Sequence, residues 1–67
     1  MHFEEFEKRI QKKGYGIAAM NHYIVNRKRY TYCVVLNKNK QTAFQAEAKK
    51  SEDVFESISN QILDLEK

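Results

Sequence analysis

His22 and Cys33 are the two residues of this chain whose types suit a chemical reaction carried out together. A thiol beside an imidazole can form a reactive thiolate, and the same pair can supply two of the three or four ligands that a metal site needs. If the first hairpin turn is centred on Arg27 and Lys28, His22 lies opposite Cys33. The sequence shows no third ligand at a useful spacing and no serine with a plausible catalytic partner. We therefore expect a structural pair in the core, with no catalytic residue, no metal and no cofactor, and we predict that the protein is not an enzyme.

Composition and length set the class of protein. The chain has 67 residues, which is enough for one domain, residues 1–67. Its hydrophobic fraction of 42% excludes a disordered chain, which cannot bury enough apolar surface to fold. No apolar run is long enough to span a membrane, and because no apolar stretch follows a basic start we expect no secretory signal. A single cysteine excludes an internal disulfide, which is typical of a cytoplasmic protein. We expect no membrane contact and no small-molecule substrate.

Five elements are predicted to position the chemistry-bearing residues. Apolar residues at helical spacing predict helices over residues 3–13 and 52–66. β-branched and aromatic residues predict strands over residues 15–26, 29–37 and 41–48. Because the turns between the strands are short, the strands form an antiparallel meander. The sequence thus predicts an α+β fold of order α-β-β-β-α, with two helices packed on one face of a three-stranded sheet.

Two residues are typical of helix ends. Gly14 follows the first helix, where a left-handed residue would end it. Ser51 precedes the second helix and is a good N-cap, with acidic residues in the first turn behind it. These signals predict where each helix meets the sheet.

One face of the predicted sheet must stay uncovered, because two short helices cover only one. With turns of even length, side-chain alternation assigns Tyr23, Tyr30 and Tyr32 to the uncovered face. The residues assigned to the core include Ala18, Thr31, Phe44 and Ala46. A contiguous aromatic patch marks an interface, or it pairs across strands and only stabilises the sheet. We expect this face to bind a protein partner or a second copy of the chain. The candidate interface residues are Tyr23, Val25, Tyr30, Tyr32, Val34 and Gln45.

Basic charge gathers in the middle of the chain. Residues 27–50 hold seven basic residues and one acidic residue, whereas residues 51–67 hold one basic and five acidic residues. In a meander, the first turn and the end of the third strand meet at the same end of the sheet. A basic cluster beside tyrosines binds a nucleic-acid backbone while bases stack on the rings, so DNA or RNA is the alternative partner; solvated loop charge is the other interpretation. The candidate nucleic-acid-binding residues are Arg27, Lys28, Arg29, Lys49 and Lys50.

The element order resembles two nucleic-acid-binding folds at the level of topology. It is similar to the double-stranded-RNA-binding domain, which places a basic cluster at the start of its last helix; here Lys49 and Lys50 precede that helix, and Glu52 and Asp53 open it. Residues 17–66 also resemble the arm-site DNA-binding domain of tyrosine integrases, which implies reading of the major groove by the open sheet face. By analogy with small phage and mobile-element accessory proteins, a larger protein that the chain binds and inhibits is a further expectation.

Overall fold

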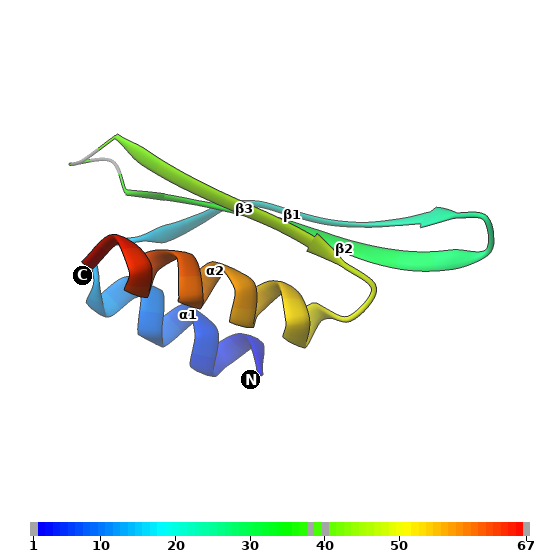
Figure 1. Ribbon diagram of the computed structural model, residues 1–67, viewed down its shortest axis with the longest axis horizontal. Helices are drawn as coiled ribbons and strands as arrows, with labels where there is room; N and C mark the ends of the chain where they lie inside the picture. Colours follow the sequence, from blue (N-terminus) through cyan, green and yellow to red (C-terminus); the bar gives the residue numbers. More distant parts are fainter. Residues whose placement is uncertain (1, 38, 40, 67) are drawn as a thin grey trace.

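Two helices lie on one face of a three-stranded antiparallel sheet (Figure 1). The computed structural model describes residues 2–37, 39 and 41–66, so Lys38 and Lys40 of the predicted second turn lie outside the described residues. β2 is the central strand, between β1 and β3. The predicted α-β-β-β-α order is confirmed, and the elements are α1 (Phe3–Lys12), β1 (Gly16–Val25), β2 (Lys28–Asn37), β3 (Thr42–Ala48) and α2 (Ser51–Glu66).

The core lies between the helices and the helix-facing side of the sheet. Phe6 of α1 stacks on Phe55 of α2 with ring centroids 4.6 Å apart, and Phe3 tilts against the same ring at 5.9 Å. Full burial of such side chains contributes about 1.5–3 kcal/mol each, which is large for a domain of this size. The apolar stripes of both predicted helices therefore form the core, as expected. The buried hydrophobic residues are Phe6, Ile10, Tyr15, Cys33, Val35, Val54, Phe55, Ile58 and Ile62.

A Schellman motif ends α1 at the predicted glycine. Gly14 has a φ of +88°, and its N–H donates to the carbonyl of Gln11 at 3.0 Å. The N–H of Tyr15 donates to the carbonyl of Ile10 at 2.8 Å, and both of these side chains are buried. This pattern of two bonds and one apolar contact stops a helix and turns the chain. It brings β1 back antiparallel to α1.

The register of the sheet follows from its two turns and one bulge. Asn26 and Arg27 both have positive φ values, 52° and 65°, so they form a two-residue turn of the type that favours hairpins. β1 and β2 pair regularly from Val25↔Lys28 to Ala19↔Val34, and Ala18 then forms a bulge. The bulge directs Ile17 toward the helix-facing side of the sheet and Ala18 away from the core. The expectation that Ala18 faces the core is wrong for that reason, while the rest of the predicted alternation holds.

The β1–β2 hairpin is longer than the rest of the sheet. The last residue of β3, Ala48, pairs with Thr31, so residues 23–30 continue beyond β3 as a two-stranded ribbon, which we call the arm. Figure 1 shows the arm projecting past both helices. The longest extent of the molecule is consequently 38 Å, against 21 and 20 Å in the other directions.

Candidate binding surface

The side of the sheet away from the helices carries the predicted interface residues. The register pairs Tyr23 with Tyr30, and it places Tyr32 between Asn21 and Glu47. Buried Thr31, Cys33 and Val35 alternate with these residues along β2 and face the helices. All six candidates therefore share one side, which we call the open face. Its members are Ala19, Asn21, Tyr23, Val25, Lys28, Tyr30, Tyr32, Val34, Leu36, Ala43, Gln45 and Glu47.

Tyr23 is held on the open face from two directions. Its ring stacks on that of Tyr30, with centroids 5.6 Å apart and an interplanar angle of 18°. Its hydroxyl donates a hydrogen bond to the carboxylate of Glu47, and this bond, with smaller contributions from desolvation and from the negative charge, raises the pKa of Tyr23 to about 12. The side chain from β1 thus reaches across β2 to β3 and fixes part of the face in one conformation.

A second bond fixes the middle of the open face. The hydroxyl of Tyr32 on β2 donates to Oε1 of Gln45 on β3 at 2.9 Å. Tyr32 and Gln45 are diagonal neighbours on the pleat, since Gln45 pairs with Val34. Ordered aromatic rings with polar tips lose little conformational entropy when a partner binds, which is why tyrosine is common in interfaces.

The open face is close to electrically neutral. Lys28 and Glu47 are its charged members, and their charges cancel. A polyanion gains little from such a surface, because its affinity comes from neutralising phosphates. The tyrosines and amide groups instead match the mixed apolar and polar chemistry of a protein interface.

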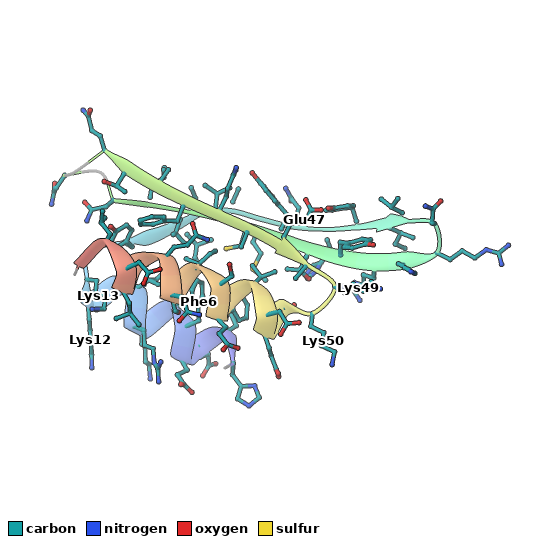
Figure 2. The ribbon with its side chains drawn as sticks, viewed as in Figure 1. Phe6, Lys12, Lys13, Glu47, Lys49 and Lys50 are labelled. Atoms are coloured by element: carbon teal, nitrogen blue, oxygen red, sulfur yellow. The ribbon has the colours of Figure 1, made fainter. Side chains whose placement is uncertain are left out.

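The predicted basic residues do not meet at one end of the sheet, because β3 ends level with Thr31 and the first turn lies beyond it. Arg27 sits at the tip of the arm, and Lys28 and Arg29 follow on opposite sides of β2. Lys49 and Lys50 lie where β3 passes into α2 (Figure 2). At about 3.3 Å per residue, Arg27 is roughly 13 Å beyond Thr31, which is level with the end of β3. All five are exposed, and none is ion-paired within the described part of the chain.

The proposed neighbours His22 and Cys33 are not opposite one another. The turn is centred on Asn26 and Arg27, one residue earlier than the register that pairs them, so His22 pairs with Thr31 and Cys33 pairs with Met20. Cys33 is fully buried, and burial raises the pKa of its thiol. Both effects make the thiol unreactive.

A chain of three polar side chains instead joins the sheet to α2. His22 Nδ1 lies 3.0 Å from Thr31 Oγ1, which lies 3.2 Å from Ser51 Oγ. Ser51 is the first residue of α2 and not its N-cap, because the carbonyl of Lys50 accepts the N–H groups of Asp53 and Val54. This network was missed from the sequence, although a threonine predicted to face the core needs a hydrogen-bond partner. It ties the base of the arm to the helix layer.

A shallow groove of about 330 Å³ lies between the carboxyl-terminal halves of the two helices. Its apolar floor includes Ile10, Ile62 and Leu63, and Arg9, Lys12 and Lys13 line one side. Arg9 is already paired with Glu5 at 3.0 Å. Lys12 and Lys13 lie at the opposite end of the helix layer from Lys49 and Lys50 (Figure 2), so the groove is separate from the arm.

Within residues 2–37, 39 and 41–66, no group of three or more His, Cys, Asp or Glu side chains is arranged to hold a metal ion. Neither helix, over its described residues, has the length and apolar character needed to cross a membrane. The sequence matches no protein-family model, and no curated protein or solved structure shows significant similarity to it.

Proposed function

We propose that the protein is a non-catalytic binding module that uses the open face to hold a protein partner. The observation that carries this proposal is the ordered, neutral tyrosine surface, in which Tyr23 is fixed by Glu47 and Tyr32 is fixed by Gln45. Both helices are on the other side of the sheet, so no described element competes for this surface. The buried, protonated thiol of Cys33 is compatible with work in the cytoplasm.

A capture experiment tests this proposal. The tagged protein is incubated with nuclease-treated extract of its native host, in parallel with Tyr32→Ala and Gln45→Arg. Gln45 is exposed at the edge of the sheet, so its replacement leaves the core intact. Leu63→Ala is the matched control, because Leu63 is 48% exposed on α2, in the helix layer.

We expect one partner to be captured by the wild type and by Leu63→Ala, with at least a tenfold loss for both open-face variants, since truncation of a central tyrosine costs about 2 kcal/mol or more. Equal capture by all four proteins would contradict the proposal, and so would a partner lost only in the Leu63 variant. Folding of each variant is checked by its thermal transition.

Nucleic-acid binding by the arm is a second candidate. The specific observation in its favour is the projection of residues 23–30 beyond β3 and the helices, with three basic and no acidic residues among them. A two-stranded ribbon has the width to enter the major groove of DNA. Tyr30 and the basic side chains next to it would then meet bases and phosphates.

Fluorescence anisotropy with labelled mixed-sequence DNA and RNA measures the nucleic-acid affinity that this second candidate function requires. Binding by the arm must weaken steeply between low and moderate salt. The variant Arg27→Glu/Lys28→Glu must lose this binding. The control Lys8→Glu/Lys12→Glu makes the same change in net charge, but on α1, and it must retain the binding. Absence of binding at low salt, or equal loss in the two variants, would eliminate the arm as a nucleic-acid site.

A further inference from the structure

The two edges of the sheet differ in how they are protected against pairing with another strand. An exposed strand edge presents unpaired N–H and C=O groups, and proteins usually cover it, shorten it or place charge on it. β3 has seven residues, carries Glu47, and has the carbonyl of Gln45 covered by Nε2 of Gln61 at 3.2 Å. β1 has ten residues, and residues 15–26 contain no Lys, Arg, Asp or Glu and no Pro.

The turn determines which backbone groups of β1 face outward. In an antiparallel pair, hydrogen-bonded and non-bonded residue pairs alternate, and a two-residue turn closes on a bonded pair, here Val25 and Lys28. Tyr23 and Asn21 therefore also bond to β2. Met20, His22 and Ile24 direct their N–H and C=O groups toward the free edge, where no described element lies beside them.

Ile24 is the most exposed large hydrophobic residue of the described chain, at 73%. It lies on the helix-facing side of the arm, beyond the reach of both helices. Met20, four residues earlier on the same side of β1, is partly buried against the core. An antiparallel partner strand could cover Ile24 with an apolar side chain of its own.

We infer that the edge of β1 pairs antiparallel with the same edge of a second copy of this chain, with His22 on the twofold axis. In this register Met20 lies opposite Ile24 of the second copy, and each outward backbone group of the three residues has a partner. The two sheets become one continuous sheet of six strands, three from each copy. The exposed Ile24 side chain is covered by Met20 of the second copy, and the paired residues 19–25 include no Lys, Arg, Asp or Glu.

Neighbouring registers are less favourable. With Asn21 on the axis, Ile24 meets Ala18, the bulged residue whose backbone departs from the regular strand. With Tyr23 on the axis, Met20 meets Asn26, which is in the turn. The bulge and the turn thus limit regular pairing to residues 19–25.

This inference uses the edge of β1, so it can be tested apart from the protein partner proposed for the open face. Sedimentation of the purified protein over a range of concentrations is expected to show a reversible species of twice the 8.0 kDa monomer mass. Ile24→Lys places a charge on the paired edge without touching the core and is expected to weaken dimerisation at least tenfold. Leu36→Lys, at a 39% exposed position of the open face on β2, is expected to leave it unchanged.

Amide hydrogen exchange of the wild type supplies a readout that needs no variant. The amides of alternate β1 residues already bond to β2 in the monomer. In the dimer the amides of Met20, His22 and Ile24 become protected as well, and the protection of these three amides increases with protein concentration. A monomer at all concentrations would overturn the inference. Loss of the dimer in Leu36→Lys but not in Ile24→Lys, or rapid exchange of the three amides in a dimer, would assign self-association to another surface and overturn it too.

Discussion

The hydroxyl of Tyr23 on β1 donates a hydrogen bond to the carboxylate of Glu47 on β3, so one side chain spans the central strand of the sheet. Tyr30, on the central strand β2, pairs with Tyr23 and stacks on its ring. A tyrosine free on the surface would sample several rotamers, and this one is held in place. The open face is therefore already ordered before any partner arrives, which lowers the entropic cost of binding.

The bond to Glu47 should be visible in an alkaline titration. Tyr23 is expected to ionise late, because its pKa is raised from 10.0 to about 12. Between these values the unfolded chain has lost the proton that the folded chain retains, so the stabilisation from this bond is complete below pH 10 and declines as the pH rises toward 12. Tyrosinate absorbance measures the ionisation. Glu47→Gln should move the ionisation step near pH 12 toward pH 10, and Tyr23→Phe should remove it. An unchanged step near pH 12 in Glu47→Gln would contradict the assignment.

The two glycines should respond oppositely to alanine. At Gly14, alanine is forced into a φ of +88°, and its Cβ would lie 3.2 Å from Nδ2 of Asn37, so a loss of about 1–2 kcal/mol is expected. At Gly16 nothing lies within 4 Å of the added Cβ, and alanine should be neutral or slightly stabilising. Urea unfolding of the two variants measures the difference. Equal effects would mean that the Schellman motif does not control the end of α1.

Arg27 occupies a left-handed position that glycine favours. We expect Arg27→Gly to raise the free energy of unfolding by about 0.5–1 kcal/mol, because relief of backbone strain exceeds the added entropy of the unfolded chain. Lys28→Gly, one residue later in regular β2, should lower it by a similar amount. Thermal unfolding compares the two, and a loss of stability in Arg27→Gly would contradict a two-residue turn at this position.

Cys33 should react with a thiol reagent only when the protein unfolds. Its side chain has no exposed surface, and its pKa is raised by burial. Adding Val25→Cys, at a 47% exposed position, supplies an internal reference thiol in the same molecule. The reference thiol should be labelled at once and Cys33 at the rate of unfolding. Simultaneous labelling of both would show that the core is open around Cys33.

The architecture and the two faces of the sheet could be predicted because each follows from a local pattern. Helical spacing of apolar residues identified both helices, and period-two alternation in β2 separated Cys33 and Val35 from Tyr32 and Val34. Gly14 predicted the end of α1 because few other residues tolerate its backbone conformation. The six interface candidates lie together because the same period-two alternation places them on one face.

The exact register could not be predicted, because its causes leave little trace in the sequence. Arg27 has positive φ without being glycine or asparagine, so the turn was open to a shift of one residue, and that shift wrongly placed His22 beside Cys33. The bulge at Ala18 contains no residue typical of bulges. The bonds from Tyr23 to Glu47 and from Thr31 to Ser51 depend on this register, and they became visible only in three dimensions.

Photo-cross-linking in living cells of the native host tests most directly whether the open face holds a protein partner. A benzoylphenylalanine replaces Ala43, an exposed open-face residue on β3 that leaves Tyr32 and Gln45 intact, and in a second strain it replaces Leu63 on α2. We expect a covalent adduct with one protein from position 43 and none from position 63. Adducts from position 63 alone, or adducts from position 43 that contain nucleic acid and no protein, would contradict the proposed function.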